Sequence, residues 1–382
     1  MDALIGITRE DWLRLLRENN FAIAPQYWNR ALAVTMMSLA NTRDQRREEQ
    51  EYGAEVKRAE IKPPLFILGH WRSGTTLLHE LLALDEQFAY ANLFQVSHPH
   101  TFLCREAIIE KALAQADTEQ RPMDAMRVGF RSPGEDESAL AVASLRSPML
   151  AWSFPRNEAY YDRFLTFREA SDDDLARWKA AFMKFLMKLS WRYGSRPLVL
   201  KSPPHTARLK LLLEMFPEAR FVHIHRDPFV VFQSTRALYD KAAAASHLQR
   251  PDPTRIDAGI LRRYAAMYEA FFEERDLIPA GRFCEIAFAE LERDPLGQVQ
   301  QIYAQLRLPG FDAVAPKMQA YVQARRDYRK NKHVPLAEPL RQRIVEAWWR
   351  SFATWGYATD GVPANSLRIN DDGSKRTNMM KT

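Results

Sequence analysis

A wholly apolar run, Leu65 to Leu68, ends in Gly69 and is followed by sequence of helical character from Thr75 to Leu84. Strands that are buried on both faces of a parallel sheet have this continuous apolar character. The same alternation of short apolar runs and helical patterns recurs along the chain. We therefore predict the α/β fold class, with βαβ units that form a parallel sheet flanked by helices.

The strand and helix patterns cover most of the chain without a linker, a repeat or a break in composition. The expected strands are 65–68, 88–93, 197–201, 220–225 and 283–286. The expected helices are 75–84, 104–127, one opened by Ser132-Pro133, 172–193, 206–216, 228–239, 256–275, 295–306 and 336–354. We predict one domain over 1–363, with a helical N-terminal extension (1–62), an α/β core (63–310) and a C-terminal helical part (311–363). Residues 364–382 are predicted to form a polar, disordered tail.

The composition indicates which kind of ligand the protein binds and in which cellular compartment it is expected. The net charge of +6 is spread along the chain, which suits a small anionic ligand and argues against bound nucleic acid. Cys104 and Cys284 are too far apart for a CxxC metal site and too few for a disulfide framework. The sequence shows neither a signal peptide nor an apolar run of the ~20 residues that span a bilayer. We expect a cytoplasmic protein without a transmembrane segment. The oligomeric state stays open, with a homodimer as one alternative.

The segment from Gly69 to Gly74, which we call the phosphate loop, lies between the first strand and its helix. Backbone N–H groups of such a loop can surround phosphate oxygens. Its glycines fit the spacing of a nucleoside-triphosphatase loop, but Thr75 stands where that loop carries Lys. No expected strand is followed by an Asp that would hold Mg²⁺. These departures weaken the alternative of a P-loop nucleotide kinase, and they leave Arg72 as the cation inside the loop.

Residues 71–78, Trp-Arg-Ser-Gly-Thr-Thr-Leu-Leu, after Phe-Ile-Leu-Gly resemble the 5′-phosphosulfate loop of sulfotransferases that use 3′-phosphoadenosine-5′-phosphosulfate (PAPS). The helical order around the motifs is similar to the bacterial, tyrosylprotein-sulfotransferase-like branch. The resemblance implies a P-loop-like sheet, PAPS as co-substrate, 3′-phosphoadenosine-5′-phosphate (PAP) as product, and no required metal. It also implies that the 5′-phosphosulfate is bound by Arg72, Ser73, Gly74, Thr75 and Thr76, with Arg72 stabilising the transferring group.

Two further segments extend the resemblance. Arg226 follows an apolar strand, and Ser234 lies about two helical turns beyond the Asp227-Pro228 helix start. The family binds the 3′-phosphate of PAPS with an Arg and a Ser at this spacing. Lys201 ends another strand before a Ser-containing turn. In the family, a Lys at this position reaches the sulfuryl oxygens, so the resemblance implies a catalytic role for Lys201.

The catalytic base is where this sequence departs from the family. Pro203 stands at the His position, and the second strand region has no carboxylate at the Glu position. The candidates are His98 or His100 after that region, His205 near Lys201, and Glu135 or Glu137 in an acidic cluster. The cluster has an alternative explanation, because acidic residues at a helix N-terminus interact favourably with its dipole. The missing base also keeps open a protein that binds PAPS or PAP without catalysis.

The acceptor is expected to be a small molecule or a lipid with a hydroxyl or amine group. An aromatic segment suits such an acceptor as a lid, but its spacing is equally that of core residues: Trp152, Phe154, Tyr160, Tyr161, Phe164 and Phe167.

Overall fold

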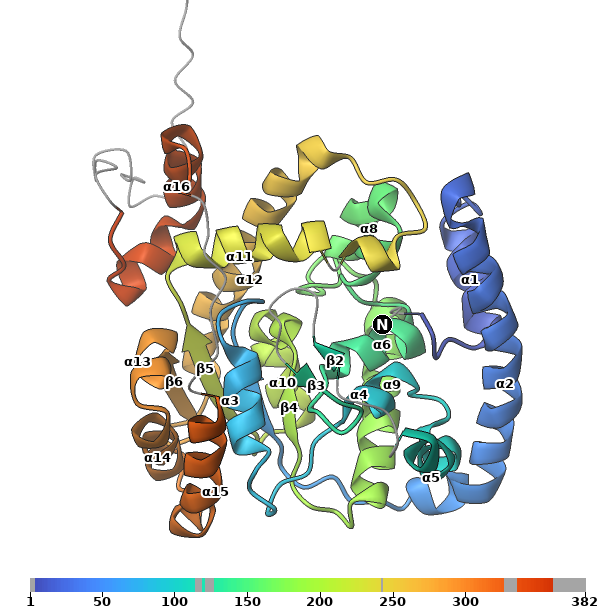
Figure 1. Cartoon of the computed structure of the whole chain (residues 1–382), viewed down its shortest axis with the longest axis horizontal. Coiled ribbons are helices and arrows are strands. Elements are labelled where there is room, and N and C mark those ends of the chain that lie inside the picture. The colour runs from blue at the N-terminus through green and yellow to red at the C-terminus, as the bar shows by residue number, and fades with distance from the viewer. Residues whose placement is uncertain (1–3, 114–118, 121–126, 242, 326–334, 360–382) are drawn as a thin grey trace, which may run out of the picture.

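The computed structural model describes residues 4–113, 119–120, 127–241, 243–325 and 335–359. Its centre is a sheet of four parallel strands in the order β4-β1-β5-β6 (Figure 1). The strands are β1 (Leu65–Leu68), β4 (Val199–Lys201), β5 (Arg220–His225) and β6 (Phe283–Ala287). Phe66 lies opposite Leu200 on one neighbouring strand and Phe221 on the other. The predicted α/β class and parallel sheet are confirmed.

The strand side chains divide between two hydrophobic cores, as the period of two in a strand requires. Phe66, Leu68 and Phe221 belong to the larger core. Leu65 and Ile67 belong to a second core on the opposite face of the sheet. Helices therefore cover both faces, and polar groups are left to gather at the ends of the strands.

The helices around the sheet largely follow the predicted ranges. The first group is α3 (Thr75–Leu82), α9 (Asp172–Arg192), α10 (Leu209–Met215), α11 (Pro228–Lys241) and α12 (Ile256–Glu274). The second group is α13 (Phe288–Arg293), α14 (Pro295–Gln305), α15 (Phe311–Ala324) and α16 (Glu338–Trp355). Short helices α7 (Leu150–Ser153) and α8 (Glu158–Asp162) precede α9. The 3₁₀ turn η3 (Pro203–Ala207) separates β4 from α10.

Two helices precede the sheet. They are α1 (Arg9–Glu18) and α2 (Trp28–Val56), and they lie along the edge of the molecule opposite α14 and α15 (Figure 1). The boundaries proposed for the domain and its parts stay predictions, and residues 364–382 lie outside the described residues. No helix in the described ranges is long and apolar enough to cross a bilayer.

The predicted strand over 88–93 is wrong. Ala89 forms a single parallel bridge with Leu198, and the chain then enters α4 (Leu93–Ser97). Asn92 caps this helix by accepting a hydrogen bond from the Gln95 N–H, while the Gln95 side chain accepts one from the Asn92 N–H. This capping box satisfies donors that a strand would have left for a neighbour.

Two predicted helix boundaries also need correction. The helix predicted over 104–127 is α5 (Phe102–Leu113), and beyond it residues 119–120 and 127–128 pair as the antiparallel strands β2 and β3. The helix predicted to open at Ser132-Pro133 begins later, as α6 (Asp136–Ser144). Ser132 Oγ accepts a hydrogen bond from the Gly129 N–H, so it closes a turn and does not cap the helix.

Candidate functional site

The phosphate loop leaves the carboxyl end of β1, and neighbouring segments hold it in shape. The Gly69 N–H donates to Thr206 Oγ1 in η3 at 2.7 Å. The His70 N–H donates to the Tyr268 hydroxyl of α12 at 3.2 Å. Within the loop, Ser73 Oγ donates to the His70 carbonyl at 2.7 Å. Hydrogen bonds to η3 and to α12 therefore hold the loop in position at the carboxyl end of the sheet.

Both loop glycines have left-handed backbone conformations and no room for a side chain. A Cβ on Gly69 (φ 141°) would lie 2.5 Å from the Ile224 carbonyl oxygen. A Cβ on Gly74 (φ 104°) would lie 2.1 Å from the Phe288 ring. Gly74 is also the N-cap of α3, and no side-chain hydrogen bond caps that helix in the described structure. The first backbone N–H groups of α3, including those of Thr75 and Thr76, are thus directed toward a place where an anion fits.

Residues of the first and second sequence motifs meet beside this loop. Arg72 has φ 71°, and its Nε donates to Ser234 Oγ at 2.8 Å. Arg226 Nη1 donates to the Arg72 carbonyl at 3.1 Å, and its guanidinium lies 4.3 Å from the centre of the Phe288 ring. Two guanidinium groups and a buried hydroxyl from distant parts of the chain are brought to one end of the sheet. The Arg72–Ser234 hydrogen bond directly joins residues that the sequence assigned to different phosphates.

Lys201 ends β4 at the same edge of the sheet and is 2% exposed. Its Nζ donates to Glu135 Oε1 at 2.6 Å. Glu135 is the N-cap of α6, and 27% of its side chain is exposed. The pair thus combines a buried ammonium group with a carboxylate that reaches solvent.

The next two acidic residues of α6 lie in different surroundings. Asp136 Oδ2 lies 2.5 Å from His205 Nε2, and both side chains are buried. Burial acts to raise the pKa of Asp136, but the neighbouring His205 and Ser202 side chains outweigh it and hold that pKa below its ordinary value. Glu137 accepts two hydrogen bonds from Arg208, at 2.7 and 3.1 Å, and neither side chain is exposed. The three neighbouring carboxylates therefore contact three different residues of 201–208.

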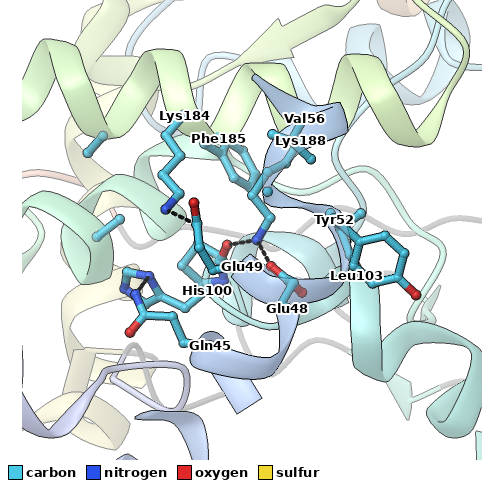
Figure 2. A pocket seen from close by; sticks show the side chains of 14 residues that line it. Gln45, Glu48, Glu49, Tyr52, Val56, His100, Leu103, Lys184, Phe185 and Lys188 are labelled. Carbon is cyan, nitrogen blue, oxygen red and sulfur yellow. Dashed lines mark hydrogen bonds and ion pairs between the residues drawn. The ribbon is translucent and has the colours of Figure 1, made fainter. Parts of the chain in front are cut away.

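His98 and His100 follow α4. Among the described residues, no hydrogen bond joins either histidine to Lys201 or to the three carboxylates of α6. His98 Nδ1 lies 3.2 Å from the Phe94 carbonyl, and the two rings stack at 4.5 Å. His100 lines a separate cavity of about 110 Å³ between α2, α5 and α9. Figure 2 shows His100 there beside Gln45, together with the ion pair of Lys188 and Glu48. Burial lowers the pKa of His98 to about 4 and that of His100 to about 3.

These two histidines give a testable dependence of stability on pH. In the folded protein they stay neutral down to about pH 4, whereas in the unfolded chain they take up protons below about pH 6.5. The unfolded state therefore binds more protons in this window, so the free energy of unfolding should fall as the pH decreases. Each histidine can contribute up to ~1.4 kcal/mol per pH unit. Urea denaturation at several pH values measures the slope. His100→Gln should flatten it, and an unchanged slope would contradict the prediction.

Several residues of the site carried no signal that the sequence analysis used. Phe288 directly follows β6, so its place at the carboxyl end of a strand was the available clue. Trp71 and Trp152 line a narrow cavity beside the phosphate loop. A larger cavity of about 530 Å³ shares Trp152, Tyr239 and Arg263 with it and opens toward η4 (Ala243–Ser246) and η5 (Pro253–Arg255). Among the described residues, no group of three or more His, Cys, Asp or Glu side chains could hold a metal ion.

The aromatic segment after α6 was expected to form either a lid over the acceptor or part of the hydrophobic core. Phe154, Tyr161 and Phe164 are fully buried in the larger core, and Phe167 is nearly so. Among the six aromatic residues, Trp152 lines both the narrow cavity and the 530 Å³ cavity, and the other five line neither. The segment is therefore mainly core, with one residue turned toward the site.

Comparisons with known proteins agree with this geometry. The pattern of the sulfotransferase family matches residues 63–313. The chain is 32% identical over 357 residues to the ω-hydroxy-β-dihydromenaquinone-9 sulfotransferase Stf3 of Mycobacterium bovis, covering 92% of this chain and 90% of the relative. The protein of the same name from Mycobacterium tuberculosis matches equally well.

Solved structures show the same fold at lower identity. Sulfotransferase STF1 from Mycobacterium tuberculosis has a TM-score of 0.64 at 19% identity, over 88% of this chain and 91% of that chain. STF9 from Mycobacterium avium has a TM-score of 0.59 at 18% identity, over 91% and 96% of the two chains. The resemblance seen in the sequence motifs is thus confirmed. With the family pattern spanning the sheet and the phosphate loop, and a relative aligned over nearly the whole chain, this protein belongs to the sulfotransferase family and is an enzyme that transfers sulfuryl groups.

Proposed function

We propose that the protein transfers the sulfuryl group of PAPS to a hydroxyl group of a lipid-like acceptor. The meeting of Arg72, Arg226 and Ser234 beside the phosphate loop is the observation that carries the donor assignment. The acceptor class is supported by the relatives, whose name gives ω-hydroxy-β-dihydromenaquinone-9, a hydroxylated lipid quinone, as the molecule they act on.

The residues at the sheet edge fit an adenosine nucleotide with phosphates at two positions. The phosphate loop and the first turn of α3 offer backbone N–H groups to the 5′ side. Arg226 presents a guanidinium and Ser234 a hydroxyl to the 3′-phosphate. Ser234 Oγ accepts from Arg72 Nε and can donate its own proton to a 3′-phosphate oxygen, so this hydroxyl would link the two phosphate positions.

In this proposal, Lys201 and Glu135 assist the transfer itself. The donor supplies a sulfuryl group joined to phosphate by an anhydride bond. Lys201 and Arg72 stabilise the charge on the sulfuryl oxygens and on the departing phosphate without a metal ion. Glu135 takes the proton of the acceptor hydroxyl as its oxygen bonds to sulfur and the bond between sulfur and the phosphate oxygen breaks. We assign the base to Glu135 because it lies beside Lys201 and reaches solvent, whereas Glu137 and His205 are fully buried in pairs.

The acceptor would occupy the cavities on the other side of the phosphate loop. Trp71 of the loop lines the narrow cavity, and Trp152, Met149 and Tyr239 add aromatic and apolar side chains to its wall. Burial lowers the pKa of His70, which also lines this space, to about 4, so its ring is neutral at neutral pH. Apart from Arg263, the wall of the narrow cavity is uncharged and largely apolar, which suits part of a hydrocarbon or quinone, whereas the larger cavity is lined by arginines and carboxylates as well.

The test is sulfuryl transfer from labelled PAPS to a short-chain hydroxylated quinone, with and without excess EDTA. We expect a sulfated product at equal rates under both conditions. A parallel calorimetric titration with PAP reports donor binding separately. If PAP binds but no sulfated product forms, the assignment of a lipid acceptor is wrong. If turnover strictly requires Mg²⁺, the metal-free mechanism is wrong.

Arg226→Ala should mainly raise the KM for PAPS and lower kcat much less. The 3′-phosphate carries no charge that develops during the reaction, so ground and transition states share this contact. A charge-assisted hydrogen bond contributes about 1.5–3 kcal/mol, which corresponds to roughly 10–150-fold in KM. Adenosine 5′-phosphosulfate lacks the 3′-phosphate and serves as the control donor. An equal loss for both donors would show that Arg226 has a structural role only.

A further inference from the structure

Helix α2 exposes a row of large apolar side chains along the first half of its length. Trp28, Leu32 and Met36 are each 62% exposed, and Leu39 is 46% exposed. Their spacing of four, four and three residues places them on one face of the helix. We call these four residues the α2 stripe. Phe21, 57% exposed, lies just before the helix and extends the apolar surface.

The opposite face of α2 is anchored to the protein. Ala31, Val34 and Ser38 are buried, and Trp12 Nε1 of α1 donates to Thr35 Oγ1 at 2.8 Å. The stripe is therefore a fixed feature of the surface. Phe21 is held outward by a left-handed backbone (φ 54°), which is uncommon for a bulky residue and unfavourable unless the surrounding structure enforces it.

The turn that leads into α2 forms part of the wall of the larger cavity assigned to the acceptor. Tyr27, the residue before the stripe, lines that cavity together with Trp152. The Ala24 N–H donates to the Leu248 carbonyl at 2.9 Å, and Arg30 donates to the His247 carbonyl. These bonds join the apolar surface to the cavity wall, so a hydrocarbon that leaves the stripe meets the cavity next.

Exposed arginines border both ends of the apolar surface. Arg43 and Arg46 follow the stripe along α2. Arg156, Arg250 and Arg255 are exposed at the rim of the cavity, where they outnumber the exposed carboxylates Asp240 and Asp252. Apolar side chains flanked by arginines, with a Trp among them, are the combination that lies in the interface of a bilayer with anionic lipids.

We propose that the α2 stripe docks this enzyme onto an anionic lipid bilayer, so that a lipid acceptor passes from the membrane into the cavity beside Tyr27. This inference rests on the proposed lipid acceptor. The charged rim and the continuity with the acceptor cavity favour a bilayer over a second copy of the chain, because a second copy explains neither of them.

The test is flotation of the purified full-length protein with vesicles of phosphatidylcholine, with and without phosphatidylglycerol. The variant carries Leu32→Ser, Met36→Ser and Leu39→Ser together, and the matched control carries Ile108→Ser and Leu277→Ser. Ile108 and Leu277 are also exposed, at 65% and 53%, but lie outside the stripe. We expect the stripe variant to bind vesicles at least about tenfold more weakly than wild type, since three apolar side chains lose their burial in lipid. The control should bind like wild type, and phosphatidylglycerol should strengthen its binding.

Three further readouts separate this proposal from its competitors. PAP binding by calorimetry should be the same in both variants, because neither touches the donor site. Turnover of an acceptor embedded in vesicles should fall in the stripe variant, whereas turnover of a water-soluble short-chain alcohol should not. If wild type fails to float, or if gel filtration shows a dimer that the stripe variant dissociates, the membrane proposal is overturned. Flotation without any sulfated product would instead reject the proposed acceptor and leave the docking surface supported.

Discussion

Glu135→Gln should lower kcat by about 10²–10⁴-fold, the range that general base catalysis supplies. Glutamine keeps the size of the side chain and an oxygen that can accept from Lys201 Nζ, so the position of Lys201 is preserved. It cannot take up the proton of the acceptor. Steady-state kinetics with a fixed acceptor measure the effect, and PAP binding should stay nearly unchanged.

A pH profile distinguishes a lost base from a displaced lysine. If Glu135 is the base, an acid limb in the pH–rate profile of the wild type should be absent in Glu135→Gln, whereas a displaced lysine would leave that limb in place. His98→Gln is the matched control, because His98 is another candidate for the base and, like His100, is only partly buried. If His98→Gln removed turnover and Glu135→Gln retained it, the base would be His98 and our assignment would be wrong.

Arg208→Met should lower the free energy of unfolding by about 3–5 kcal/mol, because it leaves the Glu137 carboxylate buried without its partner. Arg208 also donates to the Leu165 carbonyl at 3.1 Å, and its guanidinium lies 5.0 Å from the Phe167 ring. Replacing both partners of the ion pair, as Glu137→Leu with Arg208→Met, should recover part of the loss. Urea denaturation monitored by circular dichroism provides the measurement.

Arg168→Met is the control for this effect. Arg168 pairs with Glu273 and Glu274, and its side chain is 43% exposed. An exposed ion pair contributes at most about 1 kcal/mol. If the two arginine substitutions proved equally destabilising, burial of the Arg208–Glu137 pair would not be the source of its contribution.

The strands show how far local sequence reaches in this fold. The observed β1 and β5 have the bounds that were predicted. β1 is apolar along its whole length because both of its faces are buried, whereas β5 alternates apolar residues with His223 and His225. The strand prediction for the segment after Phe88 was wrong because the apolar composition of this segment suits a short buried helix equally well. The Asn92–Gln95 capping box was present in the sequence and would have indicated the helix start.

The acidic cluster marks the limit of sequence reasoning about the site. Glu135, Asp136 and Glu137 are alike in type and adjacent in the chain, but successive helical residues point about 100° apart. One therefore reaches Lys201 near solvent, and the other two are buried against His205 and Arg208. The positions of these partners depend on how η3 packs against α6, which no local pattern encodes.

The sequence by itself determined the α/β class, the phosphate loop and the family, because glycine conformations, apolar runs and the order of the motifs are local properties of the chain. Only the tertiary structure decided that Arg72 bonds to Ser234, that Phe288 lies over Arg226, and that one face of α2 remains exposed. The reason is physical: contacts between residues far apart in the chain, and the burial of a helix face, depend on what packs beside them.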